Sequence, residues 1–138
     1  MTLTLEDRLD VTELIALHGH LVDAGELDRL DEVFTADVRY DLSDFGQGEV
    51  TGLAALREAA LALGAGNPVA HHVTNVVVEE LAAGRVRARS KGLAVMANGS
   101  CGSVTYEDDV VRVGSGGWRI SHRRIRARRV PLDGLGQG

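Results

Sequence analysis

The spacing of apolar residues changes at Asn67-Pro68, and this change constrains the fold more than any other feature of the chain. Before it, apolar residues recur every three to four positions, the spacing of an amphipathic helix. After it, apolar and polar residues alternate, as in a strand with one buried face. Because the helices precede the strands, this order predicts an α+β domain in which a curved, mainly antiparallel sheet wraps the helices.

Three helices are expected in the first part of the chain. Their predicted ranges are residues 1–24, 26–34 and 53–63. The first has a broad apolar arc with His18 in its middle, and the Gly25 that follows is typical of a helix C-terminus. A short strand is expected at residues 38–42, followed by a glycine-rich connection at residues 44–52.

Four strands in an antiparallel meander are expected after Asn67-Pro68. Their predicted ranges are residues 71–80, 85–97, 104–113 and 118–130, with glycine-containing turns between them. His71 and His72 begin the first of these strands. Since successive side chains of a strand point to opposite faces, only one of the two can point toward the core. The alternation alone does not decide which one.

The composition is that of an ordinary globular protein, with 44% hydrophobic and 25% charged residues. No apolar run reaches the ~18 residues of a membrane helix, and MTLTLEDRLD lacks the features of a signal peptide. We therefore expect a cytoplasmic protein that has no membrane partner. A single Cys101 cannot form an intrachain disulfide.

The charge is unevenly distributed along the chain. The net charge is −5, yet basic residues gather in RVRARSK (85–91) and HRRIRARR (122–129). Both runs alternate basic and apolar residues, and neither contains interleaved aromatic residues on which bases could stack. The runs therefore favour a solvated sheet face over a nucleic-acid site.

The length of 138 residues suits one domain, and no repeat or linker divides it. We expect this domain to span residues 1–130. Residues 131–138, PLDGLGQG, are expected to form a flexible C-terminal tail.

Asp23 and the paired histidines are the first candidates for acid-base chemistry. Asp23 lies at the end of the first predicted helix. A carboxylate beside an imidazole fixes the tautomer of the ring and raises its basicity, which makes a histidine a general base near neutral pH. The alternative is that Asp23 caps a turn and that the histidines bind backbone groups at a strand edge.

Five further side chains could bind a substrate, namely His18, Tyr40, Asn75, Tyr106 and His122. Strand alternation places both tyrosines among apolar neighbours, so that each is either a pocket donor or a core residue. The same alternation puts Asn75 on the face of His71, and His122 on the face of Trp118. A solvated or dimer-facing role is the alternative for His122. The histidines and acidic residues are not spaced so as to supply three ligands to one metal ion, and no glycine cluster joins a strand to a helix as a phosphate-binding loop does. Neither a metal nor a cofactor is therefore expected.

Three stretches of the sequence resemble the SnoaL-like branch of the nuclear-transport-factor-2-like superfamily. They are HLVDAGELDRLDEVFTADVRYDL (20–42), HHVTNVVVE (71–79) and GGWRISHRRI (116–125). The resemblance implies a cone-shaped α+β barrel, in which three helices close a curved sheet around an apolar pocket for a small hydrophobic molecule. It also implies a homodimer.

The resemblance further implies which residues meet in that pocket. In dehydratases of this branch, such as scytalone dehydratase, an Asp at the place of Asp23 pairs with a His at the place of His71. This favours His71 over His72 as the inward residue. His18, however, stands where many relatives have a tyrosine, and RVRARSKGLAV (85–95) lacks a counterpart of the second catalytic histidine of scytalone dehydratase. Dehydration of scytalone itself is therefore not expected.

The function expected from these features is that of a cofactor-independent lyase or isomerase, of the dehydratase or ketosteroid-isomerase type. His71, oriented by Asp23, would remove a proton next to a carbonyl of a small cyclic substrate. Asp41 is a competing base for the isomerase version, although alternation suggests that it faces solvent. Two alternatives stay open, a non-catalytic ligand-binding or dimerisation module of the same fold and a polyketide cyclase.

Overall fold

The computed structural model describes residues 2–82, 84–115 and 117–136. Its two α-helices are α1 (Leu5–Asp23) and α2 (Leu53–Leu63). Its strands are β1 (Phe34–Asp41), β2 (Glu49–Thr51), β3 (Ala70–Ala82), β4 (Arg85–Val95), β5 (Cys101–Val113) and β6 (Gly117–Ala127). Short 3-10 segments lie at Leu27–Glu32, Ser43–Phe45, Gly64–Gly66 and Pro131–Gly134.

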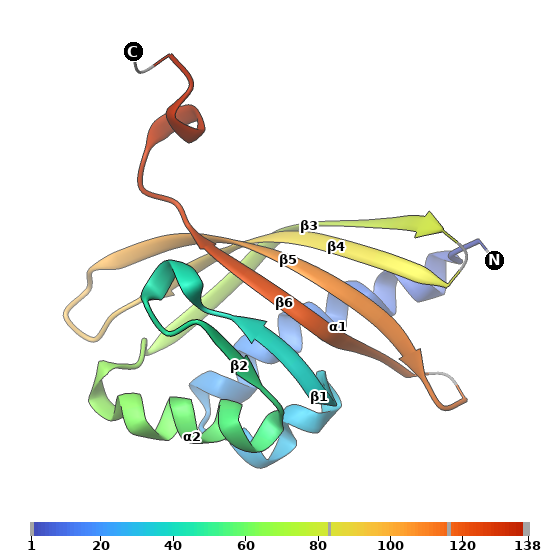
Figure 1. Cartoon of the computed structure of the whole chain (residues 1–138), viewed down its shortest axis with the longest axis horizontal. Coiled ribbons are helices and arrows are strands. Elements are labelled where there is room, and N and C mark those ends of the chain that lie inside the picture. The colour runs from blue at the N-terminus through green and yellow to red at the C-terminus, as the bar shows by residue number, and fades with distance from the viewer. Residues whose placement is uncertain (1, 83, 116, 137–138) are drawn as a thin grey trace.

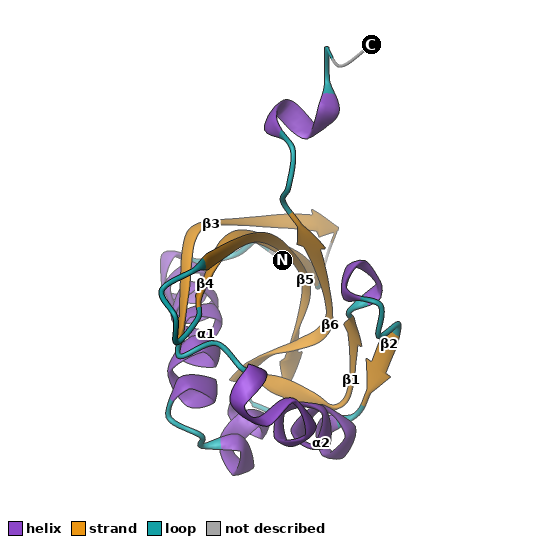
Figure 2. Cartoon of the chain, turned by 90° about the vertical axis from the view of Figure 1, so that its left-hand side faces the viewer, coloured by secondary structure: helices purple, strands orange, loops and turns teal. Residues whose placement is uncertain are grey.

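The six strands form one mixed sheet in the order β2-β1-β6-β5-β4-β3. Strands β1 and β6 run parallel, and every other neighbouring pair is antiparallel. The sheet curls strongly, and the helices α1 and α2 lie across the open side of the curl (Figure 2). Because β2 and β3 are free edges, the sheet is open and not a closed barrel. The predicted α+β architecture is confirmed.

Helix α1 begins at a capping box and buries one face. Thr4 Oγ1 accepts a hydrogen bond from the Asp7 backbone N–H, and Asp7 Oδ2 accepts one from the Thr4 N–H, both at 3.0 Å. The buried face of the helix contains Val11, Leu14, Ile15, His18, Gly19 and Leu21. This face packs against β3 along the sheet (Figure 1). The predicted apolar arc, with a histidine in its middle, is confirmed.

The core lies between α1 and the inner face of the sheet. Its fully or almost fully buried strand residues include Phe34, Val38, Val86, Ala88, Val110, Trp118 and Ile120. Trp118 is therefore a core residue, and its indole Nε1 lies 3.4 Å from Asp7 Oδ1 near the start of α1. Burial of such side chains is the main stabilising contribution in a domain of this size.

The segment between α1 and α2 differs from its prediction. The second helix is only the 3-10 segment Leu27–Glu32, and Phe34 opens β1 where a helix was expected. The backbone N–H of Ile120 donates to the Val33 carbonyl at 2.8 Å, so pairing with β6 draws this segment into the sheet. Strand β2 was not predicted and lies within the connection expected at residues 44–52. Three residues at a sheet edge give too short a pattern of alternation to recognise.

Two β-bulges reverse the expected alternation of side chains. In β3, Thr74 pairs with Lys91 but Val77 pairs with Arg89, which leaves one extra residue in β3. Asn75 sits at this bulge with a φ of 58°, a left-handed conformation that asparagine tolerates better than most residues. In β6, Ser121 is the extra residue between the pairs that Ile120 and His122 form with β5. Beyond each bulge, the side chains point to the opposite face from the one predicted.

The described residues after Arg128, up to residue 136, leave the sheet (Figure 1). Pro131–Gly134 form a 3-10 turn, and Arg128 Nη1 donates to Asp133 Oδ1 at 2.9 Å. Along the residues that the structure describes, no helix has both the length and the apolar character to cross a membrane.

Candidate functional site

A cavity of about 790 Å³ lies between the helices and the sheet. His18, Tyr40, His71 and Tyr106 all line it, so the fold brings four of the predicted site residues together. Most of the remaining wall is apolar and includes Val22, Leu27, Leu30, Leu56, Leu63, Met96, Val104 and Ile125. A volume of this size suits a small organic molecule.

Asp23 and His71 form a hydrogen-bonded pair at the edge of this cavity. His71 Nδ1 lies 2.6 Å from Asp23 Oδ1, and the backbone N–H of His71 donates to Asp23 Oδ2 at 2.9 Å. The side chains of His71 and Asp23 are 15% and 26% exposed. Both carboxylate oxygens thus bind the same residue, which fixes the ring relative to its own backbone.

The contact with Asp23 determines the tautomer of His71. A carboxylate only accepts hydrogen bonds, so the proton of the ring in its neutral form lies on Nδ1. The lone pair is then on Nε2, the atom that a general base needs. His71 lines the cavity, whereas the neighbouring His72 is exposed.

Gly19 allows the helix to come close enough for this contact. A Cβ atom at Gly19 would lie only 2.9 Å from the carbonyl oxygen of His71. Because Gly19, four residues before Asp23, has no side chain, α1 can pack directly on the start of β3.

His18 has the opposite tautomer. Arg123 Nη1 lies 3.1 Å from His18 Nδ1. Since a guanidinium only donates hydrogen bonds, Nδ1 must accept, and the proton lies on Nε2. Burial, together with the charges of Arg123 and His71, holds the pKa of His18 well below its ordinary value. His18 is therefore a neutral imidazole that offers an N–H donor.

Arg123 is held by a wholly buried carboxylate. Its Nε lies 2.7 Å from Asp108 Oδ1, and its Nη2 lies 2.9 Å from Asp108 Oδ2. Burial alone would lower the pKa of Arg123, but the charge and hydrogen bonds of Asp108 raise it above its ordinary value. The guanidinium also lies over the Tyr106 ring, with Cζ 4.3 Å from the centroid.

The two tyrosines are buried at the inner end of the cavity. Burial raises the pKa of both phenols, so each can donate a proton but does not ionise near neutral pH. The Tyr106 ring occupies space that only a glycine at position 92 leaves free, because a Cβ there would lie 2.4 Å from Tyr106 Cε2.

Asn75 and His122, by contrast, do not line the cavity. Asn75 is exposed at the β3 bulge, where its Oδ1 accepts a hydrogen bond from Thr74 Oγ1 at 2.6 Å. His122 points to the outer face because of the extra residue Ser121, and its Nδ1 lies 3.2 Å from Arg124 Nη2. At both positions, one extra residue in the strand turns the side chain away from the face that regular alternation gives it, and for His122 this agrees with the alternative of a role outside the pocket. Asp41 likewise lies outside the cavity, where its Oδ1 binds Ser43.

Asp108 was not considered from the sequence, and Arg123 was weighed beside His122 as a pocket residue but left out of the final candidates. Asp108 alternates with Tyr106 and Val110, which placed it on the inner face of β5. A buried carboxylate requires a cationic partner, so the inward position of Asp108 is a signal that could have revealed a buried arginine. The Ser121 bulge concealed which of the basic residues in β6 it was.

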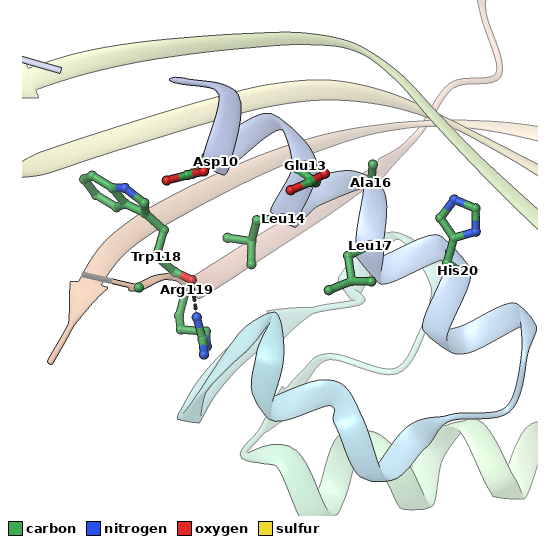
Figure 3. A pocket seen from close by; sticks show the side chains of 9 residues that line it. Asp10, Glu13, Leu14, Ala16, Leu17, His20, Trp118 and Arg119 are labelled. Atoms are coloured by element: carbon green, nitrogen blue, oxygen red, sulfur yellow. Dashed lines mark hydrogen bonds between the residues drawn. The ribbon is translucent and has the colours of Figure 1, made fainter. Parts of the chain in front are cut away.

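A second hollow, of about 600 Å³, lies between α1 and the start of β6 (Figure 3). It is lined by Asp10, Glu13, Leu14, Ala16, Leu17, His20, Gly117, Trp118 and Arg119. Figure 3 shows His20 at one end and Trp118 at the other, and none of the predicted site residues is among them. The cavity next to Asp23 and His71 is therefore the candidate site.

Metal ligands do not gather in any part of the chain that the structure describes. Within residues 2–82, 84–115 and 117–136, no three His, Cys, Asp or Glu side chains lie close enough together to hold a metal ion.

Residues 3–124 match the model of the SnoaL-like domain. No protein of curated function matches the chain. Among solved structures, a protein of unknown function with a cystatin-like fold from Nostoc punctiforme is similar, with a TM-score of 0.78 and 22% identity over 96% of this chain and 99% of that one.

Two proteins from Novosphingobium aromaticivorans are also similar. One, assigned as an aromatic ring hydroxylase, has a TM-score of 0.72 and 27% identity, over 92% of this chain and 96% of that one. The other, assigned as a scytalone dehydratase, has a TM-score of 0.73 and 20% identity, over 91% of this chain and 86% of that one. At such identities, the second likeness and that to the Nostoc protein concern the fold alone.

Proposed function

The chain belongs to the SnoaL-like domain family, and on this premise we propose that it is a cofactor-independent lyase or isomerase acting on a small, hydrophobic, cyclic substrate. The observation that carries the proposal is the 2.6 Å contact between Asp23 and His71 at the edge of a largely apolar cavity. A base that is oriented by a carboxylate and lies next to an apolar binding space suits proton abstraction from carbon.

His71 acts as the general base in this proposal. Its Nε2 lone pair takes a proton from the carbon next to a substrate carbonyl, and the C–H electrons move to the carbonyl oxygen to form an enolate. Asp23 is a positioning residue, because it keeps the Nδ1 proton in place and stabilises the imidazolium that forms.

His18 stabilises the enolate oxygen. Its neutral ring offers the Nε2–H as a donor, and the Tyr106 phenol offers a second donor in the same cavity. A neutral donor suits this role because it binds the enolate oxygen and keeps its own proton, so the His71 proton goes to carbon or to a leaving group.

Two outcomes of the enolate are compatible with these groups. In an elimination, the enolate electrons re-form the carbonyl, a double bond forms, and a hydroxyl group leaves as water after taking the proton from His71. In an isomerisation, His71 returns the proton to a different carbon, and the double bond moves. The first reaction makes the protein a lyase and the second makes it an isomerase.

Hydrogen-deuterium exchange of 1-tetralone, a bicyclic ketone, tests the proposal without knowledge of the substrate. The protein is incubated with the ketone in D₂O, and the loss of the α-proton signal is followed by NMR. We expect the wild type to accelerate exchange, and His71→Asn to lower the protein-dependent rate by about 10²- to 10⁴-fold. Asp23→Asn should lower it as well, because the ring then loses its orienting carboxylate.

His72→Asn is the matched control, since His72 is the neighbouring residue of the same type and is exposed. This variant should exchange the ketone at the wild-type rate. Equal exchange by the wild type and His71→Asn would contradict the proposed base. Binding of the ketone without protein-dependent exchange would favour the non-catalytic ligand-binding module.

A further inference from the structure

The wall of the cavity has a charge opposite to that of the whole chain. The chain contains 20 acidic and 15 basic residues, with a net charge of −5. Among the described residues that line the cavity, none is Asp or Glu, whereas two are arginines, Arg128 and Arg129. The lining side chains are therefore neutral or cationic, and the Asp23 carboxylate at the edge is already hydrogen-bonded to His71, although the protein as a whole repels anions.

The two arginines differ in whether a carboxylate of the protein already binds the guanidinium. Arg128 Nη1 donates to Asp133 Oδ1 at 2.9 Å. Arg129 is exposed, and its Cζ lies 6.0 Å from the centroid of the Phe45 ring, which also lines the cavity. Among the described residues, Arg129 has no carboxylate partner. Its charge is thus the one that a ligand can still bind.

Hydrogen bonds fix the chain at the end of β6, immediately before Arg129. The N–H of Arg128 donates to the Ser103 carbonyl at 2.8 Å, and the N–H of Ala127 donates to Asp44 Oδ2 at 3.1 Å. Arg128 is therefore attached to a fixed part of the cavity wall and Arg129 follows it directly, while the exposed Phe45 and Arg129 form the solvent-facing part of the wall. The buried tyrosines and His18 form the opposite part.

We propose that the cavity selects cyclic substrates that carry a carboxylate, with Arg129 binding this group at the mouth while the apolar ring lies toward His71. The inference rests on the proposed function, because it names the substrate class of the same site. Arg129 is then a specificity-determining residue. The Phe45 ring, whose centroid lies 6.0 Å from Arg129 Cζ, contacts the apolar part of the ligand next to the guanidinium.

Isothermal titration calorimetry with 2-naphthoate and 2-naphthamide tests this inference, since the two probes have nearly the same shape and differ in charge. The wild type should bind 2-naphthoate more tightly. Arg129→Gln should weaken 2-naphthoate binding by about three- to fivefold, the effect of one exposed ion pair, and leave 2-naphthamide unchanged. Asp133→Asn should have the opposite effect, because it frees Arg128 to bind the carboxylate.

Arg126→Gln is the matched control, because Arg126 is an exposed arginine three residues earlier in the chain, near the end of β6, and does not line the cavity. It should leave the preference for 2-naphthoate unchanged. Equal affinity of the wild type for both probes would overturn the inference, as would an Arg129→Gln variant that keeps the full preference.

The same measurements separate this inference from the proposed function. If both probes bind equally and His71-dependent exchange of 1-tetralone is observed, only the carboxylate selection is overturned. If neither probe binds and no exchange is observed, the proposed function is overturned together with the inference.

Discussion

Arg123 and Asp108 form an ion pair in which neither side chain is exposed to solvent, with Nε 2.7 Å from Oδ1 and Nη2 2.9 Å from Oδ2. Because this pair keeps the guanidinium charged and fixed, the remaining Nη1 donates to His18 and leaves the His18 proton on Nε2. An ion pair between β5 and β6 thus determines the tautomer of His18, which lines the cavity.

Asp108→Ala should destabilise the fold strongly. It removes one partner of the pair and leaves a buried, uncompensated guanidinium, which costs about 3–5 kcal/mol in comparable cases. Urea unfolding followed by circular dichroism would measure the loss as a lower midpoint.

Replacement of both partners is the informative comparison. The double variant Asp108→Leu, Arg123→Met should recover most of the stability lost by Asp108→Ala, since no buried charge then remains. Arg29→Gln breaks the exposed pair with Glu32 and serves as the surface control, with no measurable change expected. If Asp108→Ala unfolds at the same urea concentration as the wild type, the buried pair does not stabilise the protein.

The sequence was sufficient to predict the architecture but not all of the site. The spacing of Leu14, Leu17 and Leu21 predicted α1, and alternation predicted β3 to β6, because both patterns extend over many residues. Pairing of β1 with β6 depends on contacts far apart in the chain. For this reason Phe34 was assigned to a helix although it begins a strand.

The candidate site was predictable only where the alternation is regular. Tyr40 and Tyr106 lie on the predicted faces because no bulge separates them from their apolar neighbours. Asn75 and His122 lie at or just beyond bulges, and one extra residue turns every following side chain to the other face. The choice of His71 over His72 came from the family resemblance and agrees with the contact to Asp23.

Acidification should destabilise the protein partly through His18. Its folded pKa is lowered, first by burial and then by the charges of Arg123 and His71. Below about pH 6.5 the unfolded chain binds a proton that the folded chain does not, so stability falls as the pH falls, by at most ~1.4 kcal/mol per pH unit for one group. Urea unfolding at several values between pH 7.5 and 5 would measure this slope.

His18→Gln removes the titrating group and should make this pH dependence shallower. His122→Gln should act in the same direction, because burial and the charges of Arg124 and Arg39 lower the pKa of His122. A His18→Gln variant whose stability falls with pH as steeply as that of the wild type would show that His18 binds its proton in the folded state.

Alkaline titration should reveal that both tyrosines are buried. The chain contains only Tyr40 and Tyr106, and burial raises the pKa of each. At pH 10.5 the folded protein should therefore show little tyrosinate absorbance near 295 nm, whereas the urea-unfolded chain should show both groups titrating near pH ~10. Because the unfolded chain loses these protons first, stability should fall as the pH rises above ~10. Equal tyrosinate absorbance in both states would contradict the buried positions.

Gly19→Ala should disturb the pair formed by Asp23 and His71 without touching either residue. Alanine favours a helix by up to ~1 kcal/mol over glycine, but its Cβ would lie 2.9 Å from the His71 carbonyl oxygen. Relief of this contact requires α1 to move away from β3, and overpacking of this kind costs about 1–3 kcal/mol. We therefore expect lower stability in urea unfolding and slower exchange of 1-tetralone.

Gly102→Ala is the control for stability, since a Cβ there meets no atom within 4 Å and should leave the urea midpoint nearly unchanged. If Gly19→Ala were as stable and as active as the wild type, close packing of α1 on β3 would not be what positions His71.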